Sequence, residues 1–129
     1  MTEKPPLQED VRVAFEKEWT RTAQKTLIAF ANTLGGDLYL GLNEEGAATG
    51  LSKKDVKRIS HALHTFCAEE TDPVMLDLVS TKSIAAGAGN YLLRATVLPG
   101  EDRPYALKGQ RYTGGAYVRE GSTTVTATE

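Results

Sequence analysis

Hydrophobic and polar residues in the first third of the chain follow two different periods. Apolar side chains recur every three or four positions between residues 19 and 34, which is the spacing of one buried helix face, so we predict a helix over residues 20–34. The period changes to two over residues 38–42, and this alternation predicts a strand with one face on a core. Gly35 and Gly36 separate the two patterns and are expected to end the helix, because glycine readily adopts the left-handed conformation that closes a helix end.

A tight turn follows this strand and leads into a second short strand. The turn residues Asn43–Gly46 are typical of a hairpin, because Gly46 is free to adopt a positive φ. Asn32 lies at the end of the predicted helix, beside the glycine pair. Its side chain has two interpretations: a cap on the last helical carbonyls, which the spacing favours, or a polar contact at the mouth of a binding site.

A second amphipathic helix is predicted to begin after Ser52. Ser52 and Asp55 have the spacing of a capping box, with Asp55 in the position that Glu or Gln usually occupies. Apolar residues then recur at helical spacing as far as Phe66, which predicts one buried stripe. Asp72 and Pro73 end this region, because proline cannot continue a helix without losing a hydrogen bond.

The remaining elements are predicted from alternating apolar positions and turn residues. Expected strands cover residues 10–17, 74–82, 91–98, 103–108 and 116–119, with a small, flexible linker at residues 83–90. The predicted core comprises the periodic apolar residues Leu27, Phe30, Leu38, Leu40, Leu42, Val56, Ile59, Leu63, Leu93 and Val97. Helices placed among strands in this order predict an α/β (α+β) fold, a single compact domain with a mixed β-sheet and two main helices.

Length and composition indicate one domain. The 129 residues suffice for one core, and we expect a flexible arm over residues 1–8, a domain over residues 9–122 and a tail over residues 123–129 without a closing element. No apolar run approaches the ~20 residues of a membrane span, and the N-terminus lacks the apolar core of a signal peptide. Cys67 is the only cysteine, so an intrachain disulfide is excluded and a cytoplasmic location is expected.

Signatures of nucleotide and metal chemistry are missing from the sequence. Neither GxGxxG nor GxxxxGK[ST] occurs, so no phosphate loop is predicted. His61 and His64 lie three residues apart, but no HExxH motif or nearby carboxylate trio accompanies them, so we predict no metal site and no cofactor there. Cys67 adjoins the apolar stripe of the second helix and is expected in the core rather than as a nucleophile.

Two groups of basic residues are the candidates for contact with nucleic acid, because a net charge of −2 gives no overall attraction to phosphate. The helical basic set comprises Lys53, Lys54, Lys57 and Arg58 in the first turns of the second helix. The C-terminal set comprises Arg103, Lys108, Arg111 and Arg119, interleaved with the aromatic residues Tyr105, Tyr112 and Tyr117. Arginines mixed with aromatics suit phosphate contact and stacking on bases, and a solvated surface is the alternative for both sets.

Three blocks of sequence together resemble the Schlafen AlbA-like DNA-binding domain family, which also has the older label of divergent AAA domain. They are AFANTLGGDLYLGLNEEGAATGL (residues 29–51), RPYALK (residues 103–108) and AYVREGS (residues 116–122). The pattern AFAN-x-x-GG-x-x-x-x-G marks Asn32, Gly35, Gly36 and Gly41 as the motif residues. The resemblance covers residues 9–122 and implies a compact α/β domain with a nucleic-acid-related role. In bacteria such domains usually stand before other regions of larger regulators.

The same resemblance raises the question of catalysis, because some animal members of the family are ribonucleases with a trio of acids. Glu9 and Glu44 match two of these acids, whereas Ala14 occupies the position of the other. Glu16 stands where the family has lysine, and a one-residue bulge would bring it near the others. We call Glu9, Glu16 and Glu44 the acidic set. Two-metal phosphodiester chemistry needs several carboxylates held close together, so the sequence argues against nuclease activity.

The sequence therefore predicts a non-catalytic nucleic-acid-binding module, directed to DNA and of the kind found in bacterial transcriptional regulators. One alternative is a metal-dependent nuclease with an incomplete acidic site that uses Mg²⁺ or Mn²⁺. Another is a domain for protein interaction or oligomerisation, and the oligomeric state, a homodimer included, is left open. Nucleic acid is the expected partner, and no membrane partner is expected.

Overall fold

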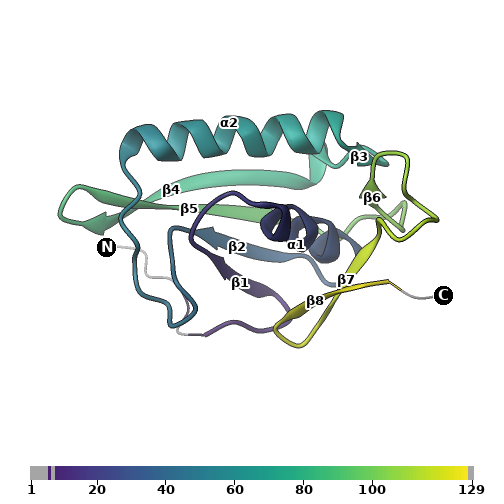
Figure 1. The fold of residues 1–129 in the computed structure, drawn as a ribbon, viewed down its shortest axis with the longest axis horizontal. Coiled ribbons are helices and arrows are strands. Elements are labelled where there is room, and N and C mark those ends of the chain that lie inside the picture. The colour runs from purple at the N-terminus through teal and green to yellow at the C-terminus, as the bar shows by residue number, and fades with distance from the viewer. Residues whose placement is uncertain (1–5, 7, 128–129) are drawn as a thin grey trace.

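The computed structural model describes residues 6 and 8–127, and its backbone is built around a four-stranded sheet (Figure 1). The elements are β1 (Val13–Glu16), α1 (Arg21–Asn32), β2 (Gly36–Leu40), α2 (Lys53–Glu69), β3 (Thr71–Asp72), the 3₁₀ helix η1 (Leu76–Leu78), β4 (Val79–Gly87), β5 (Asn90–Val97), β6 (Ala106–Leu107), β7 (Tyr117–Glu120) and β8 (Thr123–Thr126). The sheet has the order β1-β2-β5-β4, and only β1 and β2 run parallel. The expected mixed sheet with two main helices in one compact domain is confirmed.

Hydrogen bonds between residues close in the sequence determine both ends of the helix α1. The N–H of Ala23 donates to the hydroxyl of Thr20 (3.3 Å), which is the N-cap. At the other end Gly35 has a φ of +74° and donates its N–H to the carbonyl of Phe30 (2.8 Å). The helix stops at Asn32, two residues earlier than predicted, and the expected burial of Leu34 is wrong because this side chain lies past the helix end and is 54% exposed.

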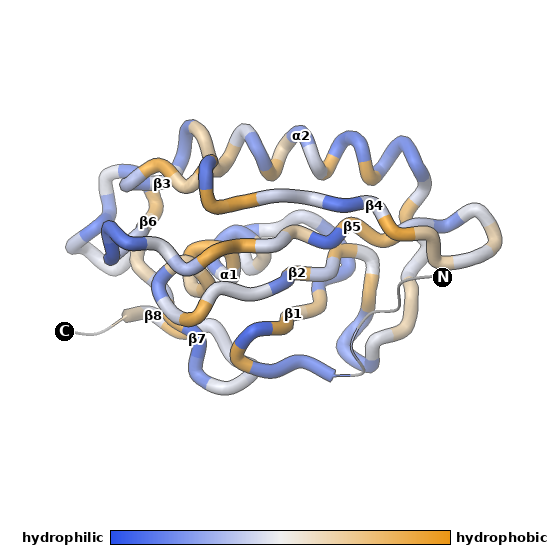
Figure 2. The backbone as a smooth tube through the Cα atoms, turned by 180° about the vertical axis from the view of Figure 1, so that it is seen from behind, coloured by the Kyte–Doolittle hydropathy of each residue, from blue (hydrophilic) through white to orange (hydrophobic). Residues whose placement is uncertain are grey.

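Two hydrophobic clusters lie on opposite faces of the sheet. The larger cluster joins α1 and α2 to one face, and it includes Phe30, Ile59, Leu38 and Leu93. The smaller cluster contains Phe15, Tyr39, Leu42, Ile84 and Leu92. Successive residues of a β-strand point to opposite faces of the sheet, which explains why the apolar side chains form two clusters. Figure 2 shows the molecule from behind, where β5 and β2 cross in front of α1.

All ten residues of the predicted core are buried, but one is on the wrong face. Leu42 was expected beside Leu38 and Leu40, and it packs instead in the smaller cluster with Tyr39. The reason is Gly41, whose φ of +101° ends the alternation of β2 and turns the following residue to the other side. The expected second strand of this hairpin is reduced to an isolated bridge between Leu42 and Ala48.

The strand predicted at residues 74–82 begins later and continues further than expected. Met75 is fully buried, and its N–H is held by the hydroxyl of Thr71 (3.0 Å), so the chain forms a compact turn and η1 before β4 begins. β4 then continues to Gly87, which corrects the prediction of a flexible linker at residues 83–90. Ile84 explains the continuation, because its side chain anchors β4 in the smaller cluster.

The two ends of the domain also differ from the prediction. The first strand is limited to β1, because Asp10 and Val13 bond to each other across a tight turn (3.0 and 3.3 Å). Residues 123–126 were expected in a tail without a closing element, and they form β8, which pairs with β7. The expectation of a flexible N-terminal arm falls largely on residues 1–5 and 7, which lie outside the described residues, as do residues 128–129.

Candidate functional site

The helical basic set lies on the first two turns of α2, on the side that faces away from the sheet. Both hydrogen bonds of the predicted capping box are formed: the N–H of Asp55 donates to Ser52 Oγ and the N–H of Ser52 donates to Asp55 Oδ2, each at 3.0 Å. Val56 and Ile59 of the same turns are buried against the sheet. The helix start and the buried stripe together fix which side chains of this segment point to solvent.

All four members of the helical basic set are exposed, but their partners differ. Arg58 Nη2 lies 3.3 Å from Glu18 Oε1 and 3.5 Å from Asp55 Oδ1. No ion pair in the described part of the chain involves the three lysines Lys53, Lys54 and Lys57. Positive charge at a helix N-terminus is unfavourable, because the helix dipole already places partial positive charge there. This end of α2 therefore carries an excess of positive charge that an anion would balance.

The C-terminal set does not present all four of its basic side chains to solvent, because Arg119 is buried. Its side chain is 6% exposed, and its Nη2 donates to the carbonyls of Asp10 (2.7 Å) and Val13 (3.1 Å). Nη1 donates to the hydroxyl of Thr124 (3.1 Å), and the guanidinium lies 5.2 Å from the ring centroid of Phe30. Arg119 thus joins β7 to the start of β1 and is not placed to contact nucleic acid.

The aromatic residues of this set divide in the same way. Tyr117 is 8% exposed and Tyr105 is 4% exposed, so neither ring offers a face for stacking, in contrast to the prediction. Tyr112 is 79% exposed and is the aromatic residue of the set that meets the prediction of an accessible ring. Arg103 and Lys108 are exposed as well, but Arg111 is half-buried and donates hydrogen bonds to backbone carbonyls.

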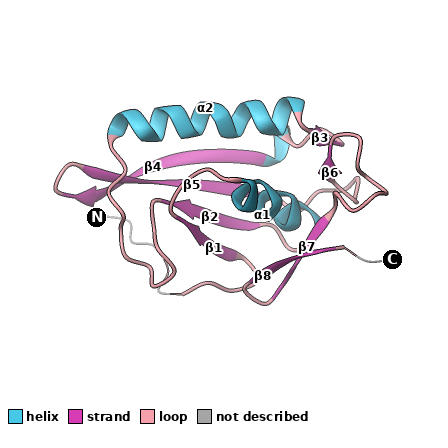
Figure 3. Ribbon diagram, in the orientation of Figure 1, coloured by secondary structure: helices cyan, strands magenta, loops and turns pink. Residues whose placement is uncertain are grey.

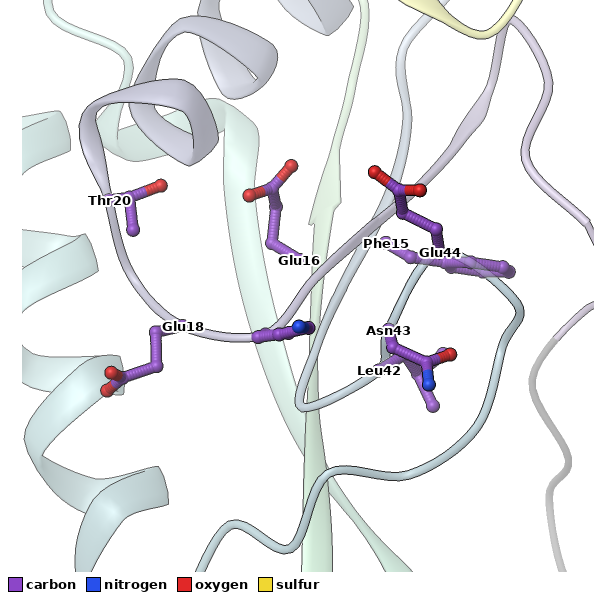
Figure 4. Close-up of a pocket in the computed structure, with 8 residues that line it drawn as sticks. Phe15, Glu16, Glu18, Thr20, Leu42, Asn43 and Glu44 are labelled. Atoms are coloured by element: carbon purple, nitrogen blue, oxygen red, sulfur yellow. The ribbon is translucent and has the colours of Figure 1, made fainter.

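The acidic set converges beside a cavity of about 420 Å³ between the β1–α1 loop and the hairpin after β2 (Figure 4). The cavity is lined by Phe15, Glu16, Lys17, Glu18, Thr20, Leu42, Asn43 and Glu44. Glu9 approaches from the preceding turn, where its carboxylate accepts the N–H of Phe15 at 2.8 Å. In Figure 4 the side chain of Glu18 points away from those of Glu16 and Glu44.

Glu9 and Glu44 are close enough to influence the ionisation of Glu16. Burial raises the pKa of Glu16, and the negative charges of Glu9 and Glu44 raise it further, while Arg119 opposes the shift. Burial in turn lowers the pKa of Arg119, and the nearby carboxylates resist that change. Ala14 stands at the sequence position of the missing acid, but it is buried in the larger cluster. Glu16 instead provides the acid that lies near Glu9 and Glu44.

The candidate metal ligands are the acidic set and the pair His61 and His64. Among residues 6 and 8–127, no group of three or more His, Cys, Asp or Glu side chains is placed to hold a metal ion. His64 of the other candidate pair contacts the hydroxyl of Thr81 at 3.2 Å.

The motif residues hold the fold together. Asn32 is not the helix cap, because Thr33 occupies that position. The Asn32 side chain instead donates to the carbonyls of Tyr105, just before β6, and Tyr117, at the start of β7, and accepts the N–H of Tyr105. A Cβ on Gly36 would meet the carbonyl oxygen of Arg12 and the ring of Phe30 at 2.7 Å, so only glycine fits where α1 crosses the start of the sheet. These contacts explain the AFAN and GG blocks by packing.

Two residues of the acidic cavity were missed by sequence reasoning. Lys17 and Asn43 both line it, and each directly adjoins a predicted acid in the sequence. Asn43 also accepts the N–H groups of Glu45 (3.0 Å) and Ala47 (2.9 Å), which shapes the turn that carries Glu44. Neither residue type carried a signal that distinguished it from ordinary turn residues.

The sequence and the fold both resemble those of known proteins. Residues 8–128 match the family described as Schlafen, AlbA_2, which indicates a nucleic-acid-binding type of domain. The crystal structure of the DIP2311 protein from Corynebacterium diphtheriae is similar in fold, with a TM-score of 0.59 and 17% sequence identity. The similarity covers 91% of this chain and 22% of that one, so this chain spans about a fifth of the length of DIP2311.

The search of curated proteins found no match. Among the described residues, no helix is long and apolar enough to cross a membrane.

Proposed function

This chain belongs to the Schlafen, AlbA_2 family, and from that premise we propose that it is a non-catalytic DNA-binding module of a bacterial-type transcriptional regulator. The contact is made by the helical basic set on the outer side of α2. We place the module in the cytoplasm, where its DNA partner and its single cysteine are both expected.

The observation that carries the proposal is the group of three exposed lysines, Lys53, Lys54 and Lys57, at the start of α2. Their charge is unfavourable for the helix, and no acid among the described residues pairs with them. Each of the three is free to contact one phosphate. Contacts of this kind position a protein on DNA without selecting a base sequence, so the module alone is expected to bind with little sequence preference.

A salt titration of binding to a labelled blunt DNA duplex tests the proposal. Each phosphate neutralised on duplex DNA contributes about −0.9 to the slope of log affinity against log salt, so three contacts give roughly −2.7. Replacing the three lysines by alanine (Lys53→Ala, Lys54→Ala and Lys57→Ala) should abolish most of that slope. The matched variant with arginine at the same positions keeps the charge and should keep the slope.

Stability provides a second measure on the same variants. Removing these cations should raise the melting temperature by a few degrees, because a cation in the first helical turn, where Lys53 and Lys54 lie, costs about 0.3–1 kcal/mol. A triple alanine variant that is folded, at least as stable, and unable to bind identifies the lysines as functional. Unchanged affinity and slope in that variant would reject the α2 surface, and no salt-dependent binding by the parent would favour the protein-interaction alternative.

The nuclease alternative is retained because Glu9, Glu16 and Glu44 are electrostatically coupled at one cavity. We expect no substantial cleavage of transfer RNA in the presence of Mg²⁺ or Mn²⁺, because Ala14 leaves the trio of acids incomplete. Metal-dependent cleavage that disappears in both Glu9→Gln and Glu44→Gln variants would establish the alternative.

A further inference from the structure

The loop between β6 and β7, residues 108–116, is a built structure at the end of the molecule where α2 finishes (Figure 1). The N–H of Leu107 donates to the carbonyl of Gly115 (2.9 Å) and closes the loop at its base. Within the loop, the carbonyl of Gln110 accepts the N–H groups of Thr113 (3.2 Å) and Gly115 (3.0 Å). These bonds hold the tip of the loop in one conformation.

Tyr112 stands at this tip with 79% of its surface exposed. The guanidinium of Arg111 lies 5.7 Å from the centroid of its ring and so backs the ring from one side. Arg111 itself is fixed, because its Nε donates to the carbonyl of Pro104 (2.9 Å) and its Nη2 to that of Asp102 (3.1 Å). The result is a supported aromatic ring that leaves one face open to solvent.

The charges around the loop indicate what the open face is suited to bind. Arg103 and Lys108 are exposed cations, and the exposed acids in the same part of the fold are Glu69, Glu70, Glu101 and Asp102. This mixture does not attract a long run of phosphates, in contrast to the start of α2. It suits a ligand that has one flat ring and one or two charges, such as a single nucleotide within a nucleic-acid chain.

We propose that Tyr112 stacks on an unpaired base, so that the module prefers DNA or RNA with a single-stranded segment next to a duplex. Bases inside a duplex are already stacked on both faces, whereas an unpaired base has a face available for an aromatic side chain. Arg103 and Lys108 supply the nearby phosphate contacts.

The inference rests on the proposed function but concerns a different surface. The lysines lie in the first turns of α2 and the Tyr112 loop lies beyond its last turn, and a helix of 17 residues is about 25 Å long. One nucleic acid reaches both surfaces only if it is several nucleotides long. The two contacts are therefore separable by the choice of oligonucleotide and variant.

The test compares a blunt duplex with the same duplex extended by a single-stranded overhang. Base stacking on an aromatic residue is worth about fivefold in affinity or more per base, so Tyr112→Ala should weaken binding to the overhang substrate by at least that factor. Its affinity for the blunt duplex should not change. Tyr112→Phe keeps the ring and should behave as the parent, and Thr113→Ala is the control for disturbance of the exposed loop.

A direct signal comes from Tyr112→Trp, whose added fluorescence should be quenched by the overhang and not by the blunt duplex. Equal affinities of parent and Tyr112→Ala for the overhang substrate would overturn the inference, as would equal losses on both substrates. Either result leaves the α2 proposal standing if the lysine variant still loses binding to the blunt duplex. If Tyr112→Ala loses binding to the overhang substrate while the triple lysine variant still binds the blunt duplex, the Tyr112 inference is supported and the α2 proposal is rejected.

Discussion

Replacement of Asn32 by alanine is expected to destabilise the domain without touching the candidate DNA surface. The side chain makes three hydrogen bonds across the fold: Nδ2 donates to the carbonyls of Tyr105 and Tyr117, each at 2.9 Å, and Oδ1 accepts the N–H of Tyr105 at 2.7 Å. It thereby ties the end of α1 to two segments more than 70 positions away, since these bonds span 73 and 85 residues.

The expected cost follows from the groups that Asn32→Ala leaves behind. Tyr105 and Tyr117 are 4% and 8% exposed, so water does not readily replace the lost partner. An unsatisfied buried donor or acceptor costs about 1–3 kcal/mol, and we take the lower end of that range for each of the three backbone groups. We expect a total of about 3 kcal/mol, which corresponds to a fall in melting temperature of roughly 10 °C for a domain of this size.

Urea unfolding followed by circular dichroism measures this loss. Leu34→Ala is the matched control, because it changes a side chain two residues away that is 54% exposed, and exposed substitutions usually stay within about 0.5 kcal/mol. A variant of Asn32 with the stability of the parent would refute the role assigned to the three hydrogen bonds. A stable Asn32→Ala protein that no longer binds DNA would instead restore the interpretation of Asn32 as a site residue.

Three other predictions follow from buried ionisable groups. Arg119→Ala should lower stability by about 3 kcal/mol in urea unfolding, because the carbonyls of Asp10 and Val13 lose charged donors, whereas DNA affinity of the folded fraction should not change. Glu16→Gln should stabilise the protein at pH 7 and not at pH 4. The pKa of Glu16 is raised above the ordinary value of 4.5, so ionisation of this carboxyl lowers the free energy of unfolding once the pH rises above 4.5. Equal changes in stability at both pH values would contradict this. Burial raises the pKa of Cys67 to about 12, so a thiol reagent should label it only after denaturation.

Much of α2 was determined by residues close to one another in the sequence. The hydrogen bonds of Ser52 and Asp55 join positions three apart, and the buried stripe depends on a fixed helical period. The same holds for the end of α1, where Gly35 closes the helix on Phe30. Such features are predictable because both partners of each interaction lie within one or two helical turns.

The sheet required more than local pattern. Alternation predicted correctly that Leu93 and Val97 share a buried face, but it did not show where β4 begins or that residues 123–126 form a strand. The start of β4 depends on how Met75 packs under α2, and β8 exists because β7 is there to pair with it. A strand is stabilised by a neighbour that its own sequence does not specify.

The candidate site shows the same division. Composition and helical spacing sufficed to place Lys53, Lys54 and Lys57 on an exposed face, because that face is opposite the apolar stripe of their own helix. Arg119 had the same sequence signal as a surface cation, yet its partners are backbone carbonyls 106 and 109 positions earlier in the chain. Whether a charged residue on a strand faces water or the interior depends on which distant segment lies over it, and only the tertiary structure decides that.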